Sequence, residues 1–342
     1  FLQYTHSMKQ PEQMQISWWR PRLDRETLRS LTRRSDWRGL VQSLGILALW
    51  TTTGLAAFHA WRNLSVGWLI LALFLHGTFY TFSGSAFHEL THGTVFKSRW
   101  LNELFLRIFA FVALQNNVFF RESHTRHHAC TLHAACDGEV VNPEYYSLGF
   151  YLRRAIIDVE GAVLQVWKIL RYSVGIIPNG WATTCFPEID VEKRRRLIRW
   201  ARILLLGHGA LAAVSIATGL WIIPVLITFG RFYGDWLHWL VNKTQHTGLR
   251  ANIPDWRISC RTFYAGPLLR FLYWNMNYHI EHHTFAAVPF FNLARLHAEM
   301  KHLCPEPKPS LVAVWREIIQ VQRRRRAGET AFCETRIPAE AS

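Results

Sequence analysis

Four long runs of apolar residues, separated by polar segments, dominate the pattern of the chain. Each run has about 20 residues, the length that an α-helix needs to cross the hydrocarbon core of a bilayer. The runs cover residues 40–60, 66–87, 200–220 and 222–241. Short turns separate the first run from the second and the third run from the fourth. The pattern therefore predicts an all-α integral membrane protein with four transmembrane helices arranged in two hairpins.

The polar segments around these runs predict how the remainder of the chain is arranged. Residues 1–36 are polar and charged, so we expect a cytosolic arm and no cleavable signal peptide. Residues 101–120 combine apolar and charged positions, which favours a re-entrant or interfacial helix over a full span. Residues 147–175 mix apolar and basic positions and are expected on the membrane surface. Residues 242–342 are polar overall and predict a cytosolic helical cap with a basic tail, within one domain that covers residues 1–342.

The charge of the chain indicates on which side of the membrane these segments lie. Lys and Arg number 39 against 24 Asp and Glu, a net charge of +15. Such a charge also occurs in nucleic-acid-binding proteins, but the apolar runs favour a membrane protein, and we expect no nucleic-acid partner. Basic residues cluster before the first and third runs, whereas the two short turns carry only Arg62. Because loops rich in Lys and Arg stay in the cytoplasm, we predict a multi-pass protein with both termini cytoplasmic.

A four-arginine run at 323–326 adds to the positive charge of the predicted tail. We expect this run to lie in solvent near anionic lipid. The alternative is that it docks an acidic redox partner.

Histidines occur in three clusters, each of which follows an apolar segment. The clusters are HELTH at 88–92, HTRHH at 124–128 and HIEHH at 279–283. Histidines three and four positions apart lie on one face of a helix, and imidazole is the commonest metal ligand among side chains. By charge topology, all three clusters are predicted on the cytoplasmic side. Eight imidazoles in three such clusters favour a site for two transition-metal ions.

The end of the fourth run carries further candidates at a spacing of four residues. His246 is a ninth candidate ligand, and Asn242 lies one helical turn before it. His238 is either a residue of the substrate pocket or a hydrogen-bonded helix histidine, and His133 is a weaker candidate ligand. The other histidines away from the clusters are expected to pack within spans or to lie on the surface. They are His59, His76 and His208 within spans, and His297 and His302 on the surface.

The number of imidazoles limits the choice of metal. A catalytic zinc needs three protein ligands and a water, so a membrane zinc hydrolase would leave most of these histidines unused. A bis-histidine haem carrier is a second alternative, and His76 with His208 would be its candidates. Nine imidazoles instead suit two irons with four to five ligands each. Ligating imidazoles usually donate their second N–H to a carboxylate. The candidate carboxylates near the clusters are Glu89, Glu122, Glu281, Asp137, Asp235 and Asp255.

The six cysteines include no CxxC pair, which argues against a zinc knuckle or a thioredoxin-like motif. We expect reduced thiols.

The three clusters and the spans between them together resemble the membrane fatty acid desaturase superfamily. The stretch NMNYHIEHHTFAAVP at 275–289 looks like the third histidine box of acyl desaturases, and 242–246 resembles a segment of stearoyl-CoA desaturases. The resemblance covers residues 40–300 and implies a four-span bundle whose cytosolic cap holds two irons. It implies no catalytic residues separate from the metal ligands, and it places Asn242 at one iron through a water. The implied ligands are His88, His92, His124, His127, His128, His246, His279, His282 and His283.

The same resemblance implies an O2-dependent enzyme that abstracts hydrogen from unactivated C–H bonds. Desaturation of a fatty acyl or lipid-like substrate is favoured. Hydroxylation by a monooxygenase of the same superfamily, or desaturation of a small amino-acid-like molecule, is the alternative. Aromatic residues in the spans are candidates to line an acyl tunnel or simply to pack. They are Phe74, Phe79, Tyr80, Phe82, Trp236 and Trp239. A small polar substrate would instead use Asp235 and His238 as its nearest anchors.

Electrons for this reaction must come from another protein. The chain has no flavin or nicotinamide fingerprint and no cysteine pattern for an iron–sulfur cluster. An HPGG stretch, which would indicate a fused cytochrome b5 module, is also missing from the sequence. We therefore expect a separate reductase with a ferredoxin or cytochrome b5-type carrier.

Overall fold

The computed structural model describes residues 14, 16–140 and 145–339, and the described chain is helical apart from turns, irregular segments and three isolated β-bridges. Three segments are long and apolar enough to cross a membrane, or four if one sharply bent pair of helices counts as a span. They run over Arg25–Asn63, Val66–Thr91 and Val191–Ala217. The all-α membrane class predicted from the sequence is therefore confirmed for the described residues.

The first two candidate spans are built from helices that lie side by side. Helix α1 (Arg25–Leu31) precedes α2 (Asp36–Asn63), and α3 (Val66–Tyr80) returns along α2 and continues into α4 (Ser83–Thr91). The predicted runs 40–60 and 66–87 lie within these helices. Ser35 caps α2 by accepting a hydrogen bond from the backbone N–H of Arg38.

The third predicted run coincides with most of α10 (Val191–Ala217), but the fourth is not one helix. Residues 222–241 form α11 (Ile222–Ile227), a 3-10 turn η2 (Gly230–Phe232) and the start of α12 (Trp236–Lys243). Gly234 has φ +68°, and a Cβ there would lie 2.7 Å from the carbonyl oxygen of Phe74 in α3. The close approach of α3 therefore requires glycine at a break in the helix. That the segment crosses the membrane stays a prediction.

A second break lies before the central histidine cluster. Helices α5 (Arg99–Val112) and α6 (Asn117–Cys130) meet at an angle of 106°. Asn116 caps α6 by accepting from the backbone N–H of Phe119. The bend agrees with the re-entrant or interfacial geometry predicted for residues 101–120, and it turns the histidine face of α6 toward α4.

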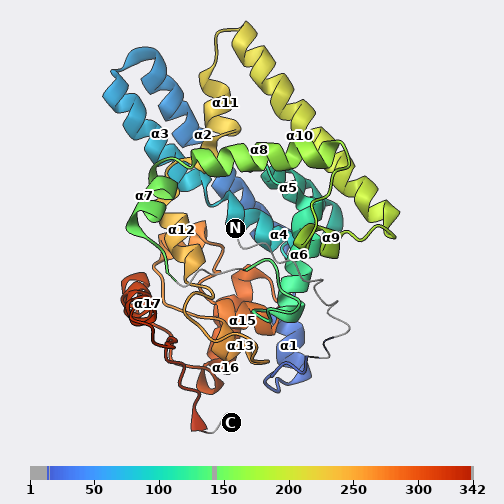
Figure 1. Ribbon diagram of the computed structural model, residues 1–342, viewed down its shortest axis with the longest axis vertical. Helices are drawn as coiled ribbons and strands as arrows, with labels where there is room; N and C mark the ends of the chain where they lie inside the picture. The colour runs from blue at the N-terminus through green and yellow to red at the C-terminus, as the bar shows by residue number, and fades with distance from the viewer. Residues whose placement is uncertain (1–13, 15, 141–144, 340–342) are drawn as a thin grey trace.

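Figure 1 shows the helices in layers along the long axis of the molecule. The far parts of α2, α3, α10 and α11 project at one end, and α8 (Val159–Ser173) crosses beneath them. Helix α7 (Leu148–Ile156) packs beside α12. The opposite end, called the base below, contains the short helices α13 (Trp256–Ser259), α15 (His279–Thr284), α16 (Leu293–Met300) and α17 (Leu311–Arg326). The smaller elements are α9 (Trp181–Cys185), α14 (Pro267–Leu272), η3 (Phe290–Asn292) and η4 (Lys301–Leu303).

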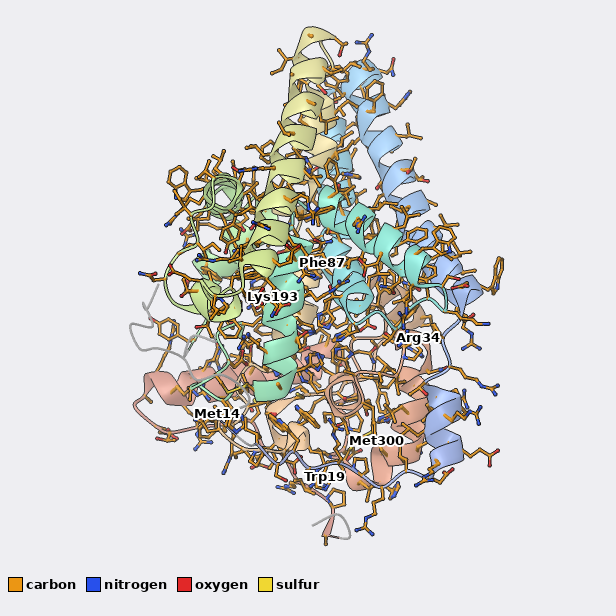
Figure 2. All side chains as sticks on the ribbon, turned by 90° about the vertical axis from the view of Figure 1, so that its right-hand side faces the viewer. Met14, Trp19, Arg34, Phe87, Lys193 and Met300 are labelled. Atoms are coloured by element: carbon orange, nitrogen blue, oxygen red, sulfur yellow. A yellow bond between two sulfur atoms is a disulfide. The ribbon has the colours of Figure 1, made fainter. Side chains whose placement is uncertain are left out.

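The two ends differ in how they bury apolar side chains. The main core lies in the base and at its junction with the projecting helices, where Trp256, Trp274 and Phe109 are fully buried. Figure 2 shows Phe87 at the level of this junction and Trp19 and Met300 within the base. The projecting helices expose apolar residues such as Leu55 and Leu206. A bilayer would cover such surfaces, which water would not.

The segment before α1 packs against the base. The Trp18 ring stacks on Trp256 with centroids 4.5 Å apart, and its indole N–H donates to the carbonyl of Ala129 at 2.9 Å. The guanidinium of Arg257 lies 3.5 Å from the ring of Trp19. This part of the predicted arm is therefore integral to the base.

Candidate metal centre

All nine histidines predicted as ligands converge at the junction of the two ends. The imidazoles lie in two adjacent groups. The first group consists of His88, His92, His124, His128 and His282. The second contains His127, His246 and His283, and His279 joins it because its Nε2 lies 3.0 Å from His246 Nε2 and 3.1 Å from His283 Nε2.

The spacing within each HxxHH cluster explains why there are two groups. In α6, His124 and His128 contribute to the first group and His127 to the second. In α15, His282 contributes to the first group, whereas His279 and His283 contribute to the second. Side chains three and four positions apart share one face of a helix but point to slightly different sides of it. A single helical turn can therefore supply imidazoles to two adjacent metal sites.

The Nε2 atoms of the first group face one another. His88 Nε2 lies 3.1 Å from His282 Nε2, and His124 Nε2 lies 3.2 Å from His92 Nε2 and 3.0 Å from His128 Nε2. Two imidazole nitrogens in such contact compete for one proton, whereas a cation between them would use both lone pairs. The donor set therefore fits a metal ion in each group.

The opposite ring nitrogens have partners that fix the tautomer required for ligation. His124 Nδ1 lies 2.7 Å from Glu139 Oε1, and His127 Nδ1 lies 2.8 Å from Asp137 Oδ2. His282 Nδ1 lies 3.3 Å from Glu89 Oε1, although neither atom forms a hydrogen bond with a described residue. An acceptor at Nδ1 holds the proton there and leaves the Nε2 lone pair for a metal.

Two ligands of the second group use uncharged partners. His246 Nδ1 donates to the carbonyl oxygen of Ser259 at 2.9 Å, and His283 Nδ1 lies 3.1 Å from Thr131 Oγ1. Together with Asp137, these partners orient three of the four imidazoles of the second group.

Burial sets the charge of these groups. It lowers the pKa of His246 to about 3 and that of His92 to about 4, which keeps both imidazoles neutral. Burial raises the pKa of Glu139 to about 7. For Asp137, burial favours the protonated acid, but His127 and backbone N–H donors outweigh it and lower the pKa. Neutral imidazoles are the form that binds metal.

Some of the carboxylates predicted near the clusters contact ligand histidines, and the others have different partners. Asp137 accepts from a ligand histidine as expected, and Glu89 lies beside another. Glu122 pairs with Lys193, Asp255 with Arg257, Asp235 with His238 and Glu281 with His297. Sequence reasoning missed Glu139; its position in the loop directly after the second cluster, two residues past Asp137, was the available signal.

The remaining histidines are held by hydrogen bonds of their own. His76 contacts Thr53 Oγ1 at 2.9 Å and the carbonyl of Leu226 at 3.1 Å. His208 contacts Thr228 Oγ1 at 2.8 Å and the carbonyl of Phe111 at 2.9 Å. Both ring nitrogens of each are thus engaged, which confirms packing roles and disfavours the haem alternative. His133 contacts backbone carbonyls and belongs to neither group.

Two expectations from the sequence are wrong. His297 is buried rather than on the surface, and its Nδ1 lies 2.5 Å from Glu281 Oε1 because α16 packs on α15; His302 is exposed as expected. The cysteines are not all reduced, since the turn after α6 brings Cys130 and Cys136 together in a disulfide. The other four are free and buried.

A cavity of about 510 Å³ lies beside the histidine groups. His88 and His124 from the first group and His127, His246 and His279 from the second line one wall of it. The rest of the lining is mixed. It includes the charged or polar residues Arg154, Arg231, Asp235, His238, Asn242 and Lys243 and the apolar or aromatic residues Phe87, Phe120, Val140, Phe150 and Trp239. A molecule in this cavity would lie against both groups.

The six aromatic residues predicted as candidates for an acyl tunnel are mostly elsewhere. Trp239 lines the cavity, but the other five do not. Tyr80 donates to the carbonyls of Ile227 and Val112, and Trp236 donates to Thr78 Oγ1, so these side chains pack helices together.

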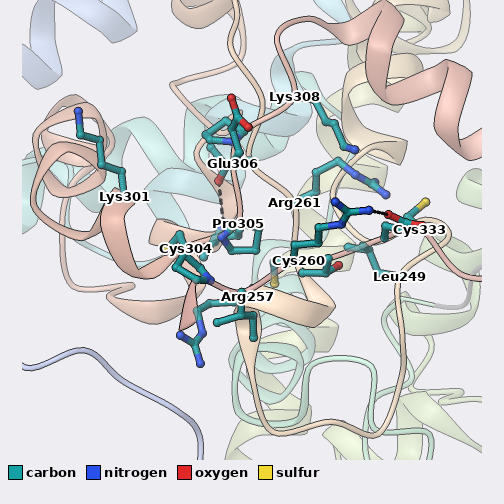
Figure 3. A pocket seen from close by; sticks show the side chains of 18 of the residues that line it. Leu249, Arg257, Cys260, Arg261, Lys301, Cys304, Pro305, Glu306, Lys308 and Cys333 are labelled. Carbon is teal, nitrogen blue, oxygen red and sulfur yellow. Dashed lines mark hydrogen bonds and ion pairs between the residues drawn. The ribbon is translucent and has the colours of Figure 1, made fainter. Parts of the chain in front are cut away.

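A larger cavity of about 890 Å³ lies in the base. Figure 3 shows its lining, with Cys260, Cys304 and Cys333 among basic side chains such as Arg261 and Lys308. None of the nine histidines lines it. Burial raises the pKa of the Cys304 thiol to about 12, so this thiol is protonated at neutral pH. This cavity is separate from the metal centre.

Comparisons with known proteins agree with this geometry. The fatty acid desaturase family model matches residues 66–315. The chain is 23% identical over 266 residues to an acyl-lipid (8-3)-desaturase of Thraustochytrium sp., covering 69% of this chain and 57% of that protein. It is 23% identical over 277 residues to an sn-1 oleoyl-lipid 12-desaturase of Arthrospira platensis, covering 69% of this chain and 74% of that protein.

Proposed function

Because the chain belongs to the fatty acid desaturase family, we propose that it is a membrane oxidoreductase that uses O2 and two iron ions to remove hydrogen from unactivated C–H bonds. The observation that carries this proposal is the pair of adjacent imidazole groups, with five histidines in one and four in the other. A single catalytic zinc needs only three protein ligands. The number of ligands therefore favours two irons over a zinc hydrolase.

The side chains of this protein would hold and orient the metal ions. The nine imidazoles would supply the ligating nitrogens, and Glu139 and Asp137 would keep the protons on the outer nitrogens of His124 and His127. Asn242 lines the cavity and would contact one iron through a water. Bound iron would supply the oxidising power toward C–H bonds, and the buried surroundings limit access of bulk water to it.

Desaturation is the outcome that the relatives favour, since both carry desaturase in their names. Removing two hydrogens from neighbouring carbons supplies two electrons, while reduction of O2 to two waters takes four. Two electrons and two protons must therefore enter from outside. A separate reductase with a ferredoxin or cytochrome b5-type carrier would supply these electrons. Hydroxylation by a monooxygenase of the same superfamily is the alternative outcome.

The same proposal includes a topology. We place the base and the histidine groups in the cytoplasm, with both termini, because basic residues cluster before α2 and in the first turns of α10. Helices α2, α3 and α10 would cross the bilayer, and the broken segment α11–α12 would complete the second hairpin. The base would then be the cytosolic cap.

Metal content tests this function most directly. We expect about two irons per purified chain and no haem absorption band. His127→Ala and His282→Ala, one from each group, should abolish turnover and lower the iron content, whereas His133→Ala should retain both. Zinc alone in the protein, or full activity in both cluster variants, would contradict the proposal.

Growth under 18O2 separates desaturation from hydroxylation. Label in the product means oxygenation, and loss of two mass units without label means desaturation.

The identity of the substrate is a separate question. The two relatives are named for acyl-lipid substrates, and an acyl substrate for this chain stays a prediction. The lining of the cavity favours the alternative of a small polar molecule.

A further inference from the structure

We propose that the substrate is a compact polar acid, with an amino or hydroxyl group in addition to its anionic group, that binds in the cavity beside the histidine groups. This inference rests on the proposed function for its chemistry and concerns only what the enzyme acts on. It differs from an acyl-lipid substrate in size, polarity and charge.

Three segments supply the cations that line the cavity. Helices α7 and α12 pack against each other (Figure 1) and contribute Arg154, Asn242 and Lys243 to its lining. The turn η2 contributes Arg231, so three cationic side chains face the same space as the imidazoles of both groups. A molecule bound in the cavity would contact a lining that holds both these cations and imidazoles of the two groups.

The partners of the three cations show which of them is available to a ligand. Arg154 bonds Asp158 at 3.0 Å, and Arg231 donates to the carbonyl of Ala113 at 3.0 Å. The Lys243 ammonium forms no ion pair within 4 Å among the described residues. Asp235 attracts it from a greater distance, and the centroid of the Tyr146 ring lies 5.9 Å away. A half-buried ammonium gains from a carboxylate within hydrogen-bond distance, and a bound acid would supply one.

Two carboxylates also line the cavity, but both are engaged. Glu139 accepts from Ser123 Oγ and lies 2.7 Å from His124 Nδ1, while Asp235 lies 3.2 Å from His238 Nδ1. The cations therefore outnumber the carboxylates around this space. The balance of charge favours a ligand with a negative group.

His238 accounts for the second polar group of the ligand. The His238 side chain lines the cavity, and its Nε2 is buried and has no hydrogen-bond partner among the described residues. With Asp235 accepting from Nδ1–H, the free Nε2 is a hydrogen-bond acceptor. A substrate amino or hydroxyl group would donate to it.

An acyl chain fits the charged part of this lining poorly. Methylene groups in the cavity would displace water from Lys243, Arg231 and His238 without returning hydrogen bonds. The apolar groove of similar size, formed by Val163, Val166 and Phe232 between α8 and η2, is lined by none of the nine histidines.

Cells that express the full-length protein with its electron donor test this inference. Polar metabolites and lipids are compared for the wild type, His127→Ala, Lys243→Met and the control Arg153→Met, which changes the neighbouring exposed cation outside the cavity. We expect a polar acid that loses two hydrogens, or gains oxygen, only in the wild type and the control, with unchanged acyl chains. Lys243→Met should retain two irons.

The outcomes separate the inference from the function. A His127-dependent change in acyl chains that persists in Lys243→Met would overturn the substrate class and leave the proposed function standing. No His127-dependent change in either fraction would overturn both.

Binding to the purified iron-loaded protein gives a readout that does not depend on turnover. The probes are straight-chain carboxylates of four to eight carbons and the alcohols of equal length, titrated by calorimetry. We expect carboxylates to bind more tightly than alcohols, and Lys243→Met to weaken carboxylate binding at least about tenfold. Equal binding of the two series, or no loss in Lys243→Met, would overturn the inference.

Discussion

Single residues around the histidines decide whether the imidazoles are ready to bind metal. Asp137 illustrates this, because its Oδ2 lies 2.8 Å from His127 Nδ1 and accepts from the backbone N–H of Leu132 at 2.8 Å. The carboxylate thus orients an imidazole and the turn after α6 at once. Glu122, which the sequence makes an equal candidate, pairs with Lys193 instead.

Asp137→Asn should therefore impair the centre although it replaces no ligand. Loss of the charge behind His127 weakens its ligation, and we expect a loss of about 10- to 100-fold in metal affinity or turnover. Iron per chain and turnover of purified protein measure this. Glu122→Gln is the control and should retain both; equal effects of the two substitutions would contradict the assignment.

His297 is a second case in which contacts outweigh position in the sequence. It is buried against Glu281, whose other oxygen accepts from Thr262 Oγ1 at 2.6 Å. His297→Ala leaves a buried carboxylate oxygen without its partner, which typically costs about 1–3 kcal/mol. We expect a lower thermal unfolding temperature in detergent. His302→Ala, at an exposed neighbour, should change it little, and a similar drop in both variants would count against the buried pair.

At the scale of elements, breaks in helices place the site as much as the helices do. The bend between α5 and α6 turns the second cluster toward α4. The break at Gly234 starts α12 at a new direction, so that His238, Asn242 and Lys243 line the cavity. An unbroken helix over 222–241 would not bring the backbone of α3 this close.

Gly234→Ala tests that break. An alanine in the left-handed conformation costs about 1–2 kcal/mol, and its Cβ would also lie 2.7 Å from the carbonyl of Phe74. We expect lower stability together with reduced turnover. Gly209→Ala in α10 is the control, because no atom lies within 4 Å of the added Cβ there, and its stability should be unchanged or higher. Full activity of Gly234→Ala would show that the break is not required.

At the scale of the whole molecule, the distribution of apolar and basic surface predicts its setting. The projecting helices expose Leu, Ile and Trp side chains, while the base buries its apolar core and carries the basic C-terminal helix α17. This division fits a bilayer around one end and an aqueous compartment around the other.

Turnover should depend on a second protein. With O2 and substrate as the sole additions, we expect no repeated turnover, because two electrons per cycle are missing. A reductase with a ferredoxin or cytochrome b5-type carrier should restore activity. If the positively charged surface of the base docks an acidic carrier protein, the turnover rate should fall as the salt concentration rises from about 0.05 to 0.5 M. Sustained turnover without a donor would contradict the electron balance.

The sequence by itself determined the helical class, the three long candidate spans and the set of nine histidines. These features depend on local periodicity: about 20 apolar residues make a span, and a spacing of three and four places imidazoles on one helical face. Asp137 and Glu89 were also within reach, because they lie beside the clusters in the chain. The break in the helix within residues 222–241 could not be predicted from the sequence, because it depends on contact with α3.

Only the tertiary structure decided how these parts combine. It divided the imidazoles into groups of five and four, brought Glu139 behind His124 and buried His297 against Glu281. It also set Lys243, Arg154 and Arg231 around one cavity and left most of the predicted tunnel aromatics as packing residues. The physical reason is that each of these facts joins residues from different helices, and the packing of those helices is not encoded in the periodicity of any one segment.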